Sequence, residues 1–351
     1  MKRLYCLFII ILYLAISIPS YAQFTINGKH IIYDKQNDTY MACIPEDAFG
    51  KDYEAIILLD IASDWSDLSI DGTQIAYSYT FKQVEGNKLY SIHARKGNKE
   101  INTKITFTFL PLLVLQGSFG YDYAQGSMSL YSPDATEPTI SLIKAKWRGG
   151  TTNTADKHKR NYKIKPLNFK GKGQDISLLG MREDNNWILD AGQIDLFRLR
   201  NRIATEIWND FATKPYYASK EPKTKSGVAG KVVEVILNNE YRGIYSLTEA
   251  MDRKELKLKK YDDKNQEFHG HLWKVSSWDK AQFWEIDKDY DNTQETWHAF
   301  ETKYPDIEDV NPTDYSPLYE AIDFVVNSND ETFKKEVGDY FDIPVLIDYQ
   351  L

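Results

Sequence analysis

Short apolar or alternating segments dominate the first third of the chain. They are rich in β-branched and aromatic residues, as at positions 40–44, 55–59, 75–81 and 105–109. This composition is typical of β-strands, and the Gly, Asn and Asp residues between them, as in Asp71-Gly72, are typical of turns. We therefore expect a small β-sandwich over residues 23–111, with no chemistry of its own.

Strand-like segments continue beyond Pro111, which ends the first set. Positions 112–119, 127–132 and 140–147 are largely apolar, and a basic strand follows at 160–165. Two further strands, at 232–237 and 243–249, are joined by a segment that contains Asn and Gly, which predicts a hairpin. We expect these strands to belong to a second domain that begins at residue 112.

Helical periodicity first appears after Asp195, which suits an N-cap. Apolar residues recur every three to four positions, at Leu196, Leu199, Ile203 and Ile207. Residues 315–326 and 331–340 also predict helices, and Asp342 with Pro344 predicts the start of another. Together with the strands, these helices predict an α+β fold.

The last predicted helix reaches Leu351 without a glycine cap, a polar tail or a helix breaker. An apolar helical pattern that stops in this way predicts a chain that is truncated at its C-terminus. The alternative is a short terminal helix that docks on the core.

The first 22 residues have the pattern of a signal peptide. Lys2 and Arg3 precede an apolar core at positions 4–18, and Ser20-Tyr21-Ala22 places small residues before Gln23. We expect cleavage there and a secreted, periplasmic or cell-envelope protein; a retained membrane anchor is the alternative. No later stretch approaches the roughly 20 apolar residues of a membrane span.

Charge and cysteine content limit the classes of function and the covalent cross-links that this chain can have. The formal net charge is −8 and becomes more negative when the signal peptide is removed, which argues against general nucleic-acid binding. Cys43 is the one cysteine left after cleavage, so no internal disulfide can form. The 24 tyrosines and eight tryptophans also leave a carbohydrate-binding surface protein open.

A glycine turn follows the strand at 140–147. Gly149 and Gly150 would let backbone N–H groups approach anionic oxygens, and Arg148 supplies a cation. The segment is neither a Walker motif nor a GxGxxG motif, so an ordinary turn is the alternative. We therefore take Arg148, Gly149 and Gly150 as candidate nucleotide-binding residues.

Two lysines and two glutamates complete the candidate nucleotide site. Lys163 and Lys165 lie two apart on a strand, so both point to one face and could pair with phosphates. Glu206 is the glutamate of the predicted helix that could hold such a lysine, and Glu249 ends a strand where kinases bind adenine through backbone groups. The alternatives are a solvated strand face for the two lysines, a surface charge for Glu206 and a salt-bridged strand end for Glu249.

The order of these parts resembles the CotH (spore-coat protein H) kinase family over about residues 140–350. The matching segments are Trp147-Arg148-Gly149, the basic strand, Leu189-Asp190-Ala191, Asn238-Asn239-Glu240-Tyr241-Arg242-Gly243-Ile244-Tyr245-Ser246-Leu247-Thr248-Glu249, and His271-Leu272-Trp273-Lys274. The resemblance implies an atypical protein-kinase-like fold, with an N-lobe at 112–253 and the start of a C-lobe at 254–351. It also implies ATP, a divalent metal such as Mg²⁺ or Mn²⁺, a protein serine acceptor, and nucleotide contacts at Arg148, Lys163 or Lys165, and Glu249.

One departure from the family concerns activity. The catalytic-loop aspartate and the Trp-Asp-x-Asp-like metal segment do not occur before Leu351. The run Asp287-Lys288-Asp289-Tyr290-Asp291 begins like an EF-hand loop, but Asn292 and His298 stand where glycine and glutamate are needed, so we predict no metal site there. We expect a kinase-like domain that is incomplete and inactive as the chain stands. The alternative is a non-catalytic envelope or cell-surface binding module.

Overall fold

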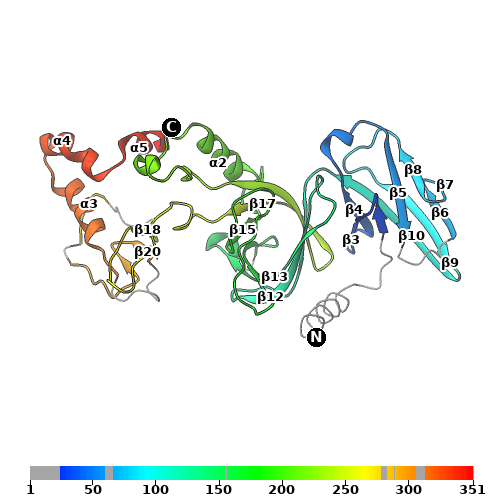
Figure 1. Cartoon of the computed structure of the whole chain (residues 1–351), viewed down its shortest axis with the longest axis horizontal. Helices are drawn as coiled ribbons and strands as arrows, with labels where there is room; N and C mark the ends of the chain where they lie inside the picture. The colour runs from blue at the N-terminus through cyan, green and yellow to red at the C-terminus, as the bar shows by residue number, and fades with distance from the viewer. Residues whose placement is uncertain are drawn as a thin grey trace. The chain divides into compact units, whose positions relative to one another are not determined.

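The computed structural model describes residues 24–59, 66–154, 156–277, 283–287, 289–305 and 313–350 (Figure 1). It has the expected mixed α+β content, in which sheets predominate. The first of two compact units comprises the residues up to Arg198 and Lys231–Leu247; the second comprises Leu199–Gly230 and the residues from Thr248 onward. The predicted signal peptide lies outside the described residues. No helix within the described ranges is long and apolar enough to cross a membrane.

Two sheets at the start of the first unit enclose one hydrophobic core, with the strand orders β2-β1-β5-β8 and β3-β4-β10-β9-β6-β7. The strands are β1 (Phe24–Ile26), β2 (Lys29–His30), β3 (Ile32–Asp34), β4 (Thr39–Cys43), β5 (Tyr53–Leu59), β6 (Ser66–Ile70), β7 (Thr73–Gln74), β8 (Ser78–Phe81), β9 (Tyr90–Lys96) and β10 (Lys99–Thr108). Phe24 and Ile57 from one sheet pack in the same core as Ile92 and Phe107 from the other. This arrangement is a β-sandwich.

Strand β5 shows how the alternating pattern builds the sandwich. Ala55 and Ile57 are buried, whereas Ile56 and Leu58 between them are about half exposed. The segment at 75–81 is not one strand, as the pattern predicted. It passes from β7 in one sheet to β8 in the other, so its first residues connect the two sheets.

The rest of the first unit is built on a closed barrel with the strand order β11-β12-β13-β14-β15-β17-β16. The strands are β11 (Leu112–Gln116), β12 (Ala124–Tyr131), β13 (Thr139–Arg148), β14 (Asn161–Leu167), β15 (Trp187–Asp190), β16 (Gly230–Leu237) and β17 (Glu240–Glu249). Parallel pairing of β11 with β16 closes the barrel. The strands predicted from residue 112 onward are all present, and β15 is an additional one.

A two-residue turn joins β16 to β17. Asn238 and Asn239 have φ angles of 53° and 65°. Positive φ at both central residues is the requirement of a type I′ hairpin turn, and asparagine tolerates this conformation better than most residues. The hairpin is therefore tighter than the pattern predicted, and β17 begins at Glu240.

Backbone and carboxylate hydrogen bonds join the sandwich to this hairpin. The buried Asp34 Oδ1 accepts the N–H of Tyr241 at 3.1 Å, and the N–H of Lys35 donates to the carbonyl of Asn239 at 2.7 Å. Met41 and Cys43 of β4 also share a small apolar cluster with Ile236 of β16. The sandwich and the barrel therefore contact each other through specific bonds.

The second unit contains a small sheet and four α-helices among its described residues. The sheet has the order β18-β20-β19, with β18 at Leu272–Val275, β19 at Thr296–Trp297 and β20 at Phe300–Tyr304. The helices are α2 (Arg200–Phe211), α3 (Ser316–Asn327), α4 (Asp330–Tyr340) and α5 (Ile343–Gln350). The last three begin and end within about one residue of the predicted positions.

Helix α2 begins at Arg200, not near Asp195 as predicted. Asp195 Oδ1 accepts the N–H of Phe197 in a turn, and Arg198 has a φ of +65°, which a right-handed helix cannot contain. The predicted apolar face is also not a core face, because Ile203 and Ile207 are 53% and 55% exposed. The buried residue of α2 is Arg202.

Candidate functional site

The glycine turn begins where β13 ends. Gly149 has a φ of +100°, and a Cβ atom there would lie 2.2 Å from Thr152 Oγ1. Asn161 Nδ2 donates to the same hydroxyl oxygen at 3.2 Å. Gly149 is thus required by both the backbone conformation and the available space. Gly150 is exposed and has open space around the position of a Cβ atom.

Lys159 lies on the loop between this turn and β14, and its ammonium group is held against β17. Nζ lies 4.1 Å from the centroid of the Tyr245 ring and donates to the carbonyl of Ile244. Burial and the nearby Arg198 guanidinium lower the pKa of Lys159 to about 8, against an opposing effect of Asp190. An ammonium group whose charge is disfavoured in this way would be stabilised by an added anion.

Asp190 at the end of β15 connects Lys159 to the glycine turn. Desolvation lowers the pKa of Arg148 from its usual value, and the Asp190 carboxylate opposes this effect. Arg148 is exposed as a whole residue, and the Asp190 carboxylate lies near enough to its guanidinium group to interact with the charge. Asn161, the Cα partner of Arg148, accepts the N–H of Ala191 at 2.6 Å. Arg148 and Lys159 therefore both lie close enough to the Asp190 carboxylate to interact with its charge, and Arg198 lies near Lys159.

Lys163 and Lys165 are on β14, half-buried, at the positions that the sequence predicted. Lys163 is the Cα partner of Lys146, and Lys165 is the Cα partner of Lys144. Because side chains alternate along a strand, these four lysines share the barrel face opposite to Ile143, Ala145 and Ile164. Two of the lysines come from β13 and were not predicted as site residues.

Glu206 forms an ion pair within its own helix. Its Oε1 lies 3.2 Å from Nε of the buried Arg202, and Arg202 Nη2 donates to the carbonyl of Val228 at 3.3 Å. The Glu206 side chain is 58% exposed. The pairing of Glu206 with a strand lysine would span the two compact units and stays a prediction.

Glu249 is fully buried at the end of β17. Its two carboxylate oxygens accept hydrogen bonds from Lys225 Nζ at 2.9 and 3.0 Å, and Oε2 also accepts the N–H of Ala229 at 3.0 Å. This carboxylate therefore has a structural role as a salt-bridged strand end. A nucleotide contact through the neighbouring backbone stays a prediction.

The acidic run from Asp287 to Asp291 has local partners. Asp287 Oδ2 lies 3.1 Å from His298 Nδ1, and Asp291 accepts bonds from Thr293 and Gln294 of its own loop. In the part of the chain that the structure describes, no three His, Cys, Asp or Glu side chains lie close enough together to hold a metal ion. A divalent metal site is therefore not identified here.

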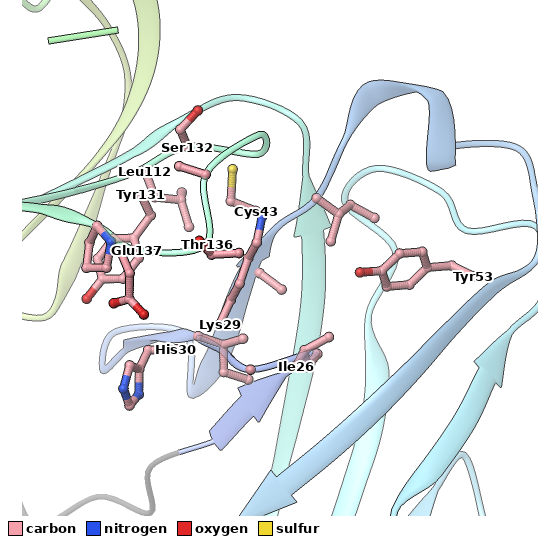
Figure 2. A pocket seen from close by; sticks show the side chains of 16 residues that line it. Ile26, Lys29, His30, Cys43, Tyr53, Leu112, Tyr131, Ser132, Thr136 and Glu137 are labelled. Atoms are coloured by element: carbon pink, nitrogen blue, oxygen red, sulfur yellow. The ribbon is translucent and has the colours of Figure 1, made fainter.

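A cavity of about 70 Å³ lies between the sandwich and the barrel (Figure 2). Cys43 and Lys29 line it, with His30 and Glu137 on one side and Tyr53 on the other. Burial raises the pKa of the Cys43 thiol to about 12, so it stays protonated and is a poor nucleophile. Lys29 Nζ donates to the carbonyl of Pro133 at 2.5 Å. We assign no chemistry to this cavity.

The comparison with protein families matches a model described as CotH kinase protein over residues 145–351, more than half of the chain. The chain belongs to this family. The match begins within β13, so it includes the glycine turn, Lys159 and both predicted strand lysines, whereas the sandwich, β11 and β12 precede it. A search of curated proteins found no match.

The sequence pattern did not identify Lys159, Asp190, Arg198 or Tyr245 as site residues. Lys159 and Arg160 stand in a basic run beside the predicted lysines, and Asp190 lies in one of the segments that resemble the family. These two features are the signals in the sequence that could have pointed to Lys159 and Asp190. Neither signal indicates that β17 brings an aromatic ring and a carbonyl oxygen to Lys159.

Proposed function

We propose that this CotH kinase family member binds ATP through a phosphate site formed by Arg148, Gly149, Gly150 and Lys159. The observation that carries the proposal is the position of the Lys159 ammonium group, between the Tyr245 ring, Arg198 and Asp190. The family's description as a kinase supports a nucleotide as the anion.

Each residue has a distinct part in the proposed site. Lys159 is held in place before the ligand arrives, so little side-chain entropy is lost on binding. The guanidinium of Arg148 can pair with two phosphate oxygens at once. Gly149 shapes the turn, and the exposed Gly150 leaves its backbone accessible to an anion. Lys163 and Lys165 extend the positive charge along β14.

The family implies further properties that belong to the same proposal. We propose that the bound ATP serves phosphoryl transfer to a protein serine or threonine, in a protein that is secreted or placed in the periplasm or cell envelope. Mg²⁺ or Mn²⁺ would neutralise phosphate charge in such a reaction. Among the described residues no group of His, Cys, Asp and Glu side chains could hold such an ion, and in this proposal Arg148 and Lys159 supply positive charge to the phosphates.

A non-catalytic binding module is the second candidate. It is favoured by Glu249, whose carboxylate is used by Lys225 and Ala229, and by the lack of an acidic metal cluster among the described residues. In this case the chain would hold a nucleotide without turnover.

The test is calorimetric titration of ATP and of a non-hydrolysable analogue into wild type and Lys159→Met. We expect wild type to bind and Lys159→Met to lose at least tenfold in affinity. Lys88→Met is the matched control, because Lys88 also lies over a tyrosine ring, at 5.2 Å from Tyr90, but in the sandwich. Absence of binding to wild type, or equal losses in both variants, would refute the site. Labelled ATP with a protein acceptor then separates the kinase from the binding module.

A further inference from the structure

Three ammonium groups surround one tyrosine ring on the outside of the barrel. Nζ of Lys144, Lys146 and Lys165 lie 5.2, 5.0 and 5.3 Å from the centroid of the Tyr123 ring. Tyr123 precedes β12, next to Ala124, whose Cα partner is Ala145 of β13. Lys163 completes the group as the Cα partner of Lys146. We call these five residues the lysine–tyrosine face.

Lys144 and Lys146 bring two positive charges to one face of β13. Because three ammonium groups share one ring centroid, they lie within about one Debye length, ~10 Å, of one another. In the described ranges, Lys144 and Lys146 contact the ring and form no ion pair with a carboxylate. The face is also a concentration of positive charge on a chain whose net charge is −8.

The shape of the face favours an extended ligand. The face is the surface of two paired strands. None of its residues lines the cavity of Figure 2. From Lys144 in the face to Arg148 in the proposed phosphate site, β13 runs four residues, or about 13 Å. An extended peptide covers this length with about four residues. Lysine recognises charge without the planar geometry that arginine imposes, so side-chain carboxylates of varied spacing would suffice.

We propose that the lysine–tyrosine face binds an acidic segment of the protein acceptor. This inference rests on the proposed function, because it places the acceptor beside the phosphate site. Arg148 belongs to that site and lies two residues from Lys146 on the same face of β13. A serine held near Arg148 would therefore have its acidic residues about two to four positions away along the peptide.

The test uses fluorescence anisotropy with two labelled peptides, a serine peptide with an Asp/Glu run and the same peptide with Asn/Gln in place of each acid. We expect the acidic peptide to bind wild type at least tenfold more tightly than the neutral one. The double variant Lys144→Gln/Lys146→Gln should lose this preference and keep its affinity for ATP. Lys82→Gln/Lys88→Gln, a double variant in the sandwich, is the matched control.

Three outcomes would overturn the inference: equal binding of the two peptides, equal losses in both double variants, or binding of inorganic polyphosphate without binding of the acidic peptide. If the double variant does not fold, the salt dependence of the wild type replaces it. Affinity for the acidic peptide should then fall steeply between about 50 and 300 mM salt, and a flat response would count against the face. Lys159→Met separates this inference from the proposed function, since it should lose ATP and keep the acidic peptide.

Discussion

The ammonium group of Lys159 lies 4.1 Å from the centroid of the buried Tyr245 ring, and it donates a hydrogen bond to the carbonyl of the preceding residue, Ile244. A lysine of a loop is thus fixed by a strand that lies 85 positions later in the chain. This contact places a cation with a lowered pKa close to Arg198 and Asp190. It determines the first prediction.

ATP affinity should fall as the pH rises through about 8. The pKa of Lys159 is lowered to about 8 in the free protein, and bound phosphates would raise it. Binding therefore needs the charged form and takes up protons near pH 8. Affinity should be constant well below pH 8 and should fall by up to about tenfold per pH unit above it. Titrations between about pH 7 and 10 check this, with proton uptake measured in buffers of different ionisation enthalpy.

Lys159→Met supplies the control for this pH profile. Because the folded state lowers the pKa of Lys159, the charged side chain opposes folding, and stability should rise as the pH increases from about 8 toward 10.5. Lys159→Met should therefore fold as well as wild type while the pH dependence of ATP binding disappears. A variant that retains the profile would assign it to another group.

Lys225→Ala should destabilise the protein by about 1–3 kcal/mol, because it leaves the fully buried Glu249 carboxylate without its ammonium partner. The cost falls below that of a fully buried ion pair because Lys225 is 42% exposed and water can reach the site. Urea unfolding measures the change. Lys223→Ala, an exposed neighbour in the same loop, should be nearly neutral. Equal stabilities of the two variants would contradict the structural role of Glu249.

Gly149→Ala should lower both stability and ATP affinity. The new Cβ atom would meet Thr152 Oγ1 at 2.2 Å, and the φ of +100° disfavours any side chain. We expect a cost of about 1–3 kcal/mol, seen as a lower midpoint in thermal unfolding. Gly150→Ala is the matched control, since its Cβ position is open and its φ is −82°. If the control loses as much stability as Gly149→Ala, the turn is not specific for Gly149.

Asp34→Ala should weaken the bond between the sandwich and the barrel hairpin. The buried carboxylate accepts N–H groups of Gln36 and Tyr241 and the side-chain amide of Asn37, and these donors would lose their partner. A loss of about 1–3 kcal/mol is expected in urea unfolding. Asp38→Ala, at an exposed position of the same loop, should cost less. Hydrogen exchange at Tyr241 would show whether the effect is local.

Local patterns predicted much of the fold. Alternation identified the strands of the sandwich and barrel, because a half-buried strand such as β5 must bury every second residue. The same logic was misleading for α2, where the 3.6-residue period is real but Ile203 and Ile207 are exposed. A period predicts a face and does not tell what covers that face.

The candidate site was harder to predict than the fold. The shared strand face of Lys163 and Lys165 was predicted correctly, because residues two apart on one strand point the same way, which is a local property; their contact with a nucleotide stays a prediction. Lys159 was not singled out because its environment depends on Tyr245 and Asp190, which the barrel brings from other strands. Glu249 shows the opposite case, since a conspicuous acid at a strand end proved to be bonded to Lys225. Long-range contacts of this kind leave no periodic signal.

Strand β17 has one more consequence. Its first residues are bonded to the sandwich, where Tyr241 meets Asp34, and a few residues later the same strand carries Ile244 and Tyr245, which hold Lys159. The loop after β3 and the Lys159 ammonium group are therefore bonded to the same strand, only a few residues apart. The sandwich therefore contacts the same strand that holds Lys159, and we expect substitutions at Asp34 to affect the proposed phosphate site at a distance.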